Sequence, residues 1–386
     1  MEAFDFQHRT RVVYGVGKIR ELGRFASDLG CKRALIVSDP GVVAAGHFAN
    51  GIQSVLHAGL SVESFHDLNE NPTTIDIGRG LEAAKSFKPD LIIGLGGGSS
   101  MDCAKGINFL YSCGGRVQDY WGVGKATHDL LPMVAVPTTA GTGSEAQSFA
   151  LITDADTKVK MACGDPKAAF RIAILDPELT LTQPMRVASL TGLDAISHAL
   201  ETYVTKRRNE LSLCYSREAW RLLSYGLPRV FHNGKDLAAR GKMQLGAFFA
   251  GLAIETSMLG AAHALANPLT ARYSTVHGQA VALMLPHVVR FNGDSVSNWY
   301  DELWQITESK EIALDSGEKA DSASRLAEFV RQLTLQSGLA TRLRDLNIQH
   351  DMLVQLARDA TKQWTAQFNP REITEEVAVK LYEAAW

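Results

Sequence analysis

The first half of the chain alternates strand patterns with segments of helical periodicity. The strand patterns, most of them runs of Val, Ile and Leu, occupy residues 33–38, 60–65, 90–95, 133–136 and 171–175. Helical periodicity fills residues 42–58 and 73–87. Strands that alternate with helices indicate a doubly wound, mostly parallel sheet, so we expect an α/β fold in this half.

The strand patterns stop after Asp176-Pro177, and only helical periodicity follows. Pro184 opens the helical region, and further helices are expected at residues 213–225, 237–255, 279–290, 320–337 and 374–386. No flexible linker separates the two halves. We therefore predict an α/β domain over residues 1–183 and an all-helical domain over residues 184–386, with a ligand between them.

The composition narrows the class of protein. The 386 residues carry a net charge of −3, and no basic block suggests a nucleic acid or an anionic membrane as partner. No apolar stretch is long enough to span a bilayer, and the N-terminus lacks the pattern of a signal peptide. The five cysteines are scattered without a C-x-x-C motif, which favours free thiols in a reducing cytoplasm.

One helical stretch, residues 192–201, carries a carboxylate and an imidazole one turn apart. Asp194 and His198 stand at i and i+4 and therefore project from one face of the helix. Such a pair can bind one divalent cation, and His263 and His277 could complete a nitrogen-rich site suited to iron or zinc. The alternative is a hydrogen-bonded Asp–His pair without a metal, because this spacing is common on helices.

A glycine-rich loop, residues 94–102, follows a predicted strand and opens a helix. Its three consecutive glycines let the backbone approach a ligand closely, and the free N–H groups of the helix start favour an anion such as a pyrophosphate. The loop departs from the G-x-G-x-x-G pattern, because Ser99 stands where the last glycine would be. A tight turn without a ligand is the alternative.

Two more polar features stand at the carboxyl ends of predicted strands, where open α/β sheets bind ligands. Residues 137–145, with four hydroxyls and two glycines, suit a polar ligand, or form a turn in which Thr142 or Ser144 caps the next helix. Asp39 could accept hydrogen bonds from a ribose diol and would repel a 2′-phosphate, which favours NAD over NADP. An Asp that only initiates a turn before Pro40-Gly41 is the alternative.

Together these elements resemble the iron-dependent, or group III, alcohol dehydrogenase family, in order and through nearly the whole chain. The matching motifs are residues 96–99 with Asp102, Ala104 and Lys105; 137–145; 191–195 with His198 and Glu201; 263–265 with Pro268; 277–278 with 285–286; and 369–371. The Thr-rich loop, residues 137–145, and the Asp-x-x-x-His helix, residues 192–201, are specific to the family, whereas a glycine run alone is not.

The resemblance implies an NAD-binding α/β domain, residues 1–183, and an all-helical metal and catalytic domain, residues 184–386. It implies reversible hydride transfer between NAD and a small or medium alcohol or diol, with the metal as a Lewis acid. It also implies a homodimer. The ligands of Fe(II), or alternatively of zinc, are then Asp194, His198, His263 and His277.

The resemblance also assigns residues to the parts of the cofactor. These are Gly97, Gly98 and Ser99 at the pyrophosphate; Thr138, Thr139, Thr142 and Ser144 at the nicotinamide half; Asp39 and Lys160 at the ribose; and Asn71 beside the adenosine.

Two departures and two alternatives accompany the resemblance, and one departure, Phe170 where relatives usually have Pro, is expected to change only a loop. Many relatives have a second histidine where this chain has Asn267, which can neither be protonated nor act as a base. Dehydroquinate-synthase-like and glycerol-phosphate-dehydrogenase-like enzymes share the architecture but need basic residues to hold a phosphorylated substrate. Apart from Arg272, no Lys/Arg cluster lies near the ligand motifs, so this alternative ranks lower. A catalytically silent relative that only binds NAD or metal is the other alternative.

Overall fold

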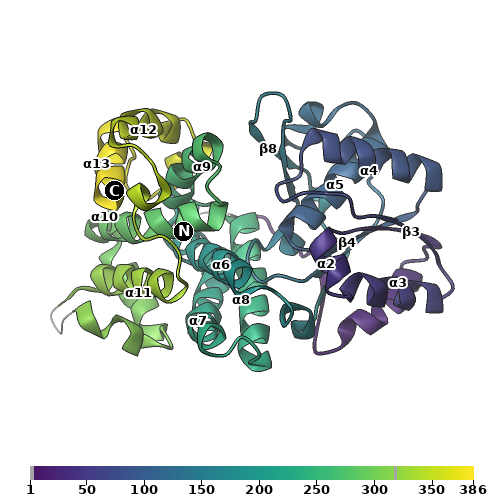
Figure 1. The fold of residues 1–386 in the computed structure, drawn as a ribbon, viewed down its shortest axis with the longest axis horizontal. Helices are drawn as coiled ribbons and strands as arrows, with labels where there is room; N and C mark the ends of the chain where they lie inside the picture. The colour runs from purple at the N-terminus through teal and green to yellow at the C-terminus, as the bar shows by residue number, and fades with distance from the viewer. Residues whose placement is uncertain (1–3, 317–319) are drawn as a thin grey trace. The chain divides into compact units, whose positions relative to one another are not determined.

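The computed structural model of the protein describes residues 4–316 and 320–386. Contacts divide the chain into two compact units, one of residues Gln7–Gln183 and one of residues 4–6 together with Pro184–Trp386. The first unit contains strands and helices, and the described part of the second contains helices only (Figure 1). The expected fold class is therefore confirmed.

The first unit is built on a six-stranded sheet with the order β1-β9-β6-β4-β2-β3. Every neighbouring pair is parallel. The strands are β1 Arg11–Tyr14, β2 Arg33–Val37, β3 Ser61–Phe65, β4 Leu91–Gly96, β6 Met133–Pro137 and β9 Ile172–Leu175. The chain runs from β2 outward to β3 and returns to β4 on the other side of β2. Sheets of this kind bind ligands outside the carboxyl ends of the strands where the order reverses, here β2 and β4.

Helices cover both faces of this sheet, with α4 and α5 on one face and α2 and α3 on the other (Figure 1). The helices of the unit are α1 Leu22–Asp28, α2 Pro40–Ala44, α3 His47–His57, α4 Thr74–Phe87 and α5 Gly98–Cys113. The single helix expected over residues 42–58 is in fact two. Gly46 lies between them with a φ of 81°, a left-handed conformation that ends α2 and that glycine adopts without strain.

A second, three-stranded sheet was not predicted from the sequence. It has the order β5-β8-β7, with β5 Gly122–Val123, β7 Phe149–Thr153 and β8 Lys160–Gly164. Strands β7 and β8 are antiparallel. These strands, like β1, are two to five residues long and only partly buried, and of them only β7 has four consecutive apolar residues as the central strands do.

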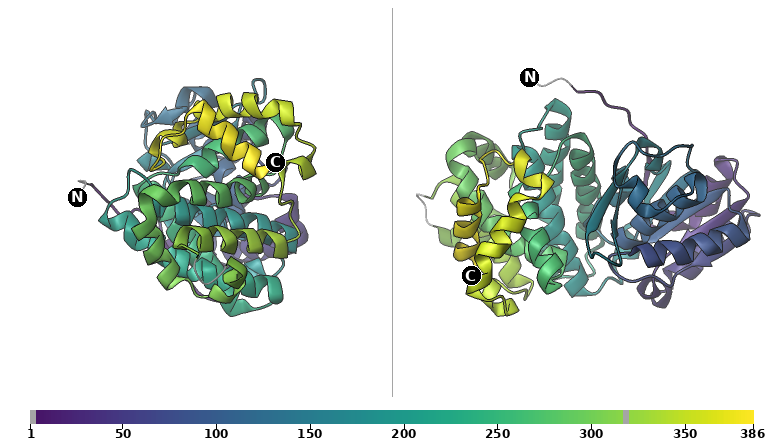
Figure 2. Two further views of the ribbon diagram at one scale, coloured as in Figure 1. Left: turned by 90° about the vertical axis from the view of Figure 1, so that its left-hand side faces the viewer. Right: turned by 90° about the horizontal axis from the view of Figure 1, so that it is seen from above.

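The second unit is a helical assembly, seen from two further sides in Figure 2. Helix α6 packs against α7, α8 and α10, and α10 also packs against α9 and α11. The helices are α6 Met185–Val204, α7 Glu210–His232, α8 Leu237–Thr256, α9 Ala261–Tyr273, α10 His277–Ile306, α11 Ser322–Gln336, α12 Leu353–Thr361 and α13 Glu375–Ala385. The predicted helical segments fall within or close to these bounds, whereas α9 and α12 were not predicted as helices.

Short 3-10 helices connect many of these elements. They are η1 Lys18–Glu21, η2 Val117–Tyr120, η3 Ser144–Ala146, η4 Pro166–Ala168, η5 Pro177–Thr180, η6 Lys310–Ser316, η7 Leu343–Leu346, η8 His350–Met352 and η9 Trp364–Phe368. Within the described ranges, no single helix has the length and apolar composition needed to cross a membrane. The consecutive helices α8 and α9 meet those criteria only as a pair bent by 101°.

Candidate functional site

Helix α6 directs two of the predicted metal ligands to one buried point. Its apolar residues pack against three neighbouring helices, so that nearly every position after Ala188 is buried. Asp194 and His198 are only 5% and 4% exposed. Oδ1 of Asp194 lies 3.3 Å from Nε2 of His198, so the two side chains share one face of the helix, as their spacing predicts.

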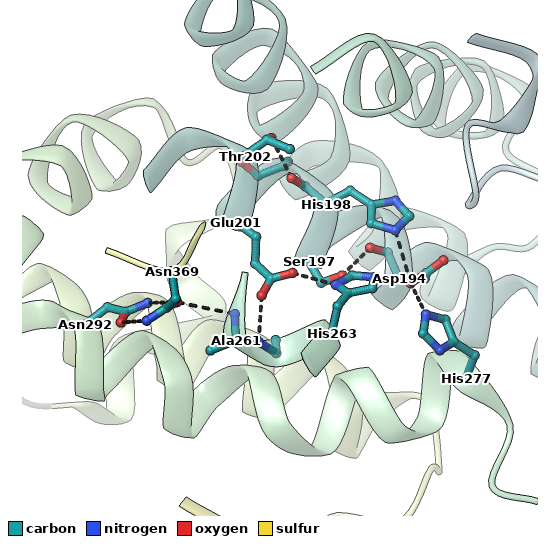
Figure 3. A network of polar contacts seen from close by, with 12 residues as sticks. Asp194, Ser197, His198, Glu201, Thr202, Ala261, His263, His277, Asn292 and Asn369 are labelled. Atoms are coloured by element: carbon teal, nitrogen blue, oxygen red, sulfur yellow. Dashed lines mark hydrogen bonds and ion pairs between the residues drawn. The ribbon is translucent and has the colours of Figure 1, made fainter. Parts of the chain in front are cut away.

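The other two predicted ligands come from separate helices. His263 lies in the first turn of α9, and His277 is the first residue of α10. Their Nε2 atoms lie 3.6 Å and 3.7 Å from the same Oδ1 of Asp194. Figure 3 shows the three rings around this carboxylate. Three imidazole nitrogens from three helices therefore surround one carboxylate oxygen.

The chemistry of these atoms fits a divalent cation. Oδ1 of Asp194 and Nε2 of His263 are buried, yet neither forms a hydrogen bond with any part of the chain that the structure describes. Asp194, His263 and His277 each offer a donor atom, and these atoms lie within 4.8 Å of one another. Buried polar atoms without partners are costly, and one cation would satisfy both. A set of one carboxylate and three imidazoles suits Fe(II) or zinc.

The electrostatics of the site also favour a cation. Burial raises the pKa of Asp194, but the imidazoles of His198, His263 and His277 outweigh burial and hold that pKa well below its usual range. The carboxylate therefore stays ionised. Burial lowers the pKa of His263, whereas the carboxylates of Glu201 and Asp194 raise it, with the net result of a pKa of about 9.

Close packing between α6 and α10 brings His277 to the site. A Cβ atom on Gly278 would lie 2.2 Å from the carbonyl oxygen of Leu190, far inside van der Waals contact. Glycine at this position lets the start of α10 rest directly on the backbone of α6. Because His277 is the adjacent residue, this contact positions its ring.

In the first unit, Asp39 and the glycine-rich loop meet where the strand order reverses. Asp39 caps α2, since its Oδ1 accepts a hydrogen bond of 3.1 Å from the N–H of Val42. Its Oδ2 accepts one of 3.0 Å from the hydroxyl of Ser100 in the first turn of α5. Asp39 therefore does initiate a turn, and it also links the carboxyl ends of β2 and β4.

The glycine-rich loop lies directly against the Thr-rich loop. A Cβ on Gly98 would come within 2.7 Å of the Thr142 side chain, and one on Gly97 within 3.3 Å of the Thr139 side chain. The N–H of Thr138 donates to the carbonyl of Gly96 at 2.9 Å. Gly97 caps α5 without a side-chain hydrogen bond, which leaves the N–H groups of the helix start without a side-chain acceptor.

A buried lysine, Lys105, which in the sequence stands out only as part of a motif, anchors the Thr-rich loop. Lys105 is fully buried, and its Nζ donates to the carbonyl and hydroxyl of Ser144 and to the carbonyls of Gln147 and Phe149, at 2.7–3.0 Å. The hydroxyl of Ser144 in turn donates to Asp102 at 2.7 Å. The sequence carried only one indication of this network, the two charged residues Asp102 and Lys105 in an otherwise uncharged helix.

The helix-capping alternative for the Thr-rich loop is not what the structure has. The next helix is the short η3, its N-cap is Gly143, and no side chain caps it. Thr142 instead accepts from the N–H of Ser144 at 3.3 Å, which forms a local turn.

Asn71, Ser99 and Lys160, which come from three separate segments, also meet. The N–H of Asn71 donates to the Ser99 hydroxyl at 3.1 Å, and Lys160 Nζ donates to the Asn71 side-chain oxygen at 3.4 Å. All ten residues predicted to contact the cofactor thus lie in the first unit, in loops, strands and the first residues of helices α5 and η3, and such contacts join several of these segments.

Asn267 and Arg272 are both engaged by residues near the end of α12. Asn267 donates to the side chain of Gln363 at 3.1 Å, and Arg272 donates to the carboxylate of Asp359. The charge of Arg272 is therefore balanced by an acid, which weakens the alternative of a phosphorylated substrate.

Two family models together match most of the chain. The model for iron-containing alcohol dehydrogenases matches residues 9–177, and that for the C-terminal part of the Fe-containing alcohol dehydrogenase family matches residues 188–386. The chain belongs to the iron-containing alcohol dehydrogenase family. The resemblance stated from the motifs is thereby confirmed, and the chain is an oxidoreductase.

Individual relatives match the chain over nearly its whole length. The NAD-dependent methanol dehydrogenase of Bacillus methanolicus is 32% identical over 363 residues, which cover 94% of each protein. The 1,3-propanediol dehydrogenase of Klebsiella pneumoniae is 31% identical over 387 residues, 99% of each. The crystal structure of a 1,3-propanediol oxidoreductase matches with a TM-score of 0.94 and 29% identity, covering 100% of both chains. The chain therefore shares the fold of this solved structure over its whole length.

Proposed function

We propose that the chain is a metal-dependent NAD(H) alcohol dehydrogenase that interconverts a small or medium alcohol or diol with its aldehyde. Family membership supports the class of reaction, and relatives named for methanol and 1,3-propanediol support a small substrate. The observation that carries the proposal is the position of three imidazole Nε2 atoms within 3.3–3.7 Å of Oδ1 of Asp194.

Asp194, His198, His263 and His277 are the proposed metal ligands and form the proposed catalytic site. They would hold Fe(II), with zinc as the alternative. When bound, the ion would supply Lewis-acid polarisation of the substrate oxygen. The chain's own contribution is to hold three ring nitrogens and one ionised carboxylate toward a single buried point.

The proposed NAD site follows the carboxyl edge of the parallel sheet, within an NAD-binding domain of residues 1–183. Residues 184–386 are the proposed metal and catalytic domain. Hydride chemistry belongs to the cofactor, and the chain supplies contacts that orient it. These are Gly97, Gly98 and Ser99 for the pyrophosphate; Thr138, Thr139, Thr142 and Ser144 for the nicotinamide half; and Asp39, Asn71 and Lys160 for the adenosine and its ribose. Their support is the set of contacts that joins these loops.

Removal of the metal tests the catalytic part of the proposal. Anaerobic chelation is expected to lower NADH formation from simple alcohols by about a thousandfold or more, because several kcal/mol of polarisation is lost. Fe(II) or zinc should restore the activity, while NADH binding, followed by its fluorescence, should persist without metal. Full turnover by protein shown to be metal-free by elemental analysis would contradict the proposal. A protein that binds metal and NAD but turns over no alcohol or aldehyde would support the catalytically silent alternative.

Replacing Asp39 tests the ribose assignment. Asp39→Gly is expected to raise the ratio of kcat/KM with NADP to that with NAD by on the order of tenfold, because a charge that repels the 2′-phosphate is lost. Helix α2 should tolerate the change, since glycine caps a helix at a cost of only a few tenths of a kcal/mol, roughly. Asp39→Asn, which keeps the capping oxygen but not the charge, should shift the ratio in the same direction. Unchanged selectivity in both variants would refute the assignment.

We further propose that the protein is a cytoplasmic homodimer. The five cysteines are free, including the exposed Cys214, which is consistent with a reducing compartment. Among the described strands, β1 pairs only with β9, so one edge of the sheet offers hydrogen-bonding groups to a second copy.

A further inference from the structure

Glu201 is a buried carboxylate beside the candidate metal site that the site itself does not use. It lies on α6 two turns after Asp194 and one turn after His198, so it shares their face of the helix. Its side chain is only 4% exposed. Burying a carboxylate this deeply costs free energy unless both oxygens accept hydrogen bonds. The partners of Glu201 therefore indicate its role.

Both oxygens of Glu201 are directed at helix α9. Oε2 accepts a hydrogen bond from Nδ1 of His263, and Oε1 accepts one of 2.6 Å from the backbone N–H of Ala262 (Figure 3). In the neutral form of the His263 ring, which is the form that can bind a metal, this first bond places the single proton on Nδ1. Nε2, which faces Asp194, is then left with its lone pair free. Glu201 therefore sets both the tautomer and the orientation of this ring.

A pair of buried side-chain amides, those of Asn369 and Asn292, also supports the start of helix α9. Oδ1 of Asn369 accepts a hydrogen bond of 3.3 Å from the N–H of Ala261. Asn369 and Asn292 also exchange two side-chain hydrogen bonds, of 2.8 and 3.1 Å, and each is only 1% exposed (Figure 3). Two orphan N–H groups at the start of α9 are thus satisfied by side chains from α6 and from the C-terminal segment, which fixes the height and rotation of His263.

We propose that Glu201 is a positioning residue for metal binding and that it acts through His263. This inference rests on the proposed metal site. It holds the ring in the tautomer that offers Nε2 to the ion. Asn369, braced by Asn292, supports the same helix start. Neither Glu201 nor Asn369 is itself a proposed metal ligand.

The test measures metal affinity rather than turnover. Metal-free wild-type and Glu201→Gln proteins are titrated with Zn²⁺ against a chromophoric chelator. The Kd of the variant is expected to be higher by roughly 10–100-fold. Glu201 uses a different oxygen for each partner, whereas glutamine places an NH₂ group at one of these two positions. An NH₂ group that faces Nδ1 of His263 favours the wrong tautomer of the ring, and one that faces the N–H of Ala262 opposes two donors. An unchanged Kd overturns the proposal.

Two comparisons separate positioning from general destabilisation. Glu328 is another buried carboxylate of the helical unit, 8% exposed and bonded to Arg331, and Glu328→Gln should leave the Kd for zinc unchanged. In a His263→Ala background, Glu201→Gln should cause little further loss of affinity, because its effect passes through the missing ring. A full, additive loss in that background overturns the proposal.

The wild-type protein supplies a test that does not depend on the folding of a variant. In zinc-loaded protein with ¹⁵N-labelled histidine, the His263 ring, assigned by its loss in His263→Ala, should show a proton on Nδ1 and metal on Nε2. Metal on Nδ1, or a proton on Nε2, overturns the proposal.

If the wild-type protein binds no divalent ion, the proposed function fails. If it binds zinc and Glu201→Gln binds equally well, only the positioning role fails.

Discussion

Replacing Asp194 with asparagine is expected to lower kcat/KM for alcohol oxidation by on the order of a thousandfold, at about 1.4 kcal/mol per factor of ten. The low pKa of Asp194 means that its carboxylate carries a full negative charge, and all three imidazoles lie within 3.3–3.7 Å of its Oδ1. A neutral amide of the same shape removes that charge and weakens the hold on a divalent cation. The measurements are steady-state kinetics and the metal content of the purified protein.

Ser197 provides a matched control for this substitution. It lies on the same helix, is fully buried and donates its hydroxyl to the backbone carbonyl of Asp194 at 2.6 Å. Ser197→Ala removes one buried hydrogen bond near the site without changing a proposed ligand, so metal content should stay near that of the wild type. Equal metal content and activity in wild-type and Asp194→Asn proteins would count against Asp194 as a ligand.

Replacing Gly278 with alanine is expected to destabilise the helical unit by about 3 kcal/mol or more, because the new Cβ has no space. It would meet the carbonyl oxygen and carbon of Leu190 at 2.2 and 2.8 Å, and these are backbone atoms that cannot rotate away. Relief of the clash must move α10 from α6 and carry His277 away from Asp194. Thermal unfolding of the metal-free protein and a zinc titration should therefore show a lower midpoint and a weaker affinity together.

Gly78 serves as the comparison for a glycine-to-alanine change as such. It lies within α4, and a Cβ built there meets nothing within 4 Å. Gly78→Ala should therefore stabilise its helix by roughly 0.5–1 kcal/mol and leave zinc affinity unchanged. If Gly278→Ala behaves like Gly78→Ala, then the tight contact between α6 and α10 does not position His277.

The candidate site was only partly predictable, and its parts show why. Asp194 and His198 could be paired from their spacing, because residues four apart on a helix are neighbours whatever the rest of the fold does. Nothing local indicated that His263 and His277 would reach the same oxygen, since that depends on how α9 and α10 pack on α6. The partners of Glu201, Asn369 and Lys105 were equally hidden, because a buried polar side chain carries no periodic pattern.

The sequence by itself determined the coarse plan of the fold, an α/β half followed by a helical half, and the types of donor atom available to a metal. It also determined the family, because the Thr-rich loop and the Asp-x-x-x-His helix are short sequence motifs that can be recognised without the fold. These features depend on residues that are close together in the chain. The tertiary structure alone decided the small sheet, the reversal of strand order that brings Asp39 to Ser100, and the meeting of three histidines at Asp194. Such contacts join distant segments, and their geometry is set by packing of the whole core rather than by any local preference.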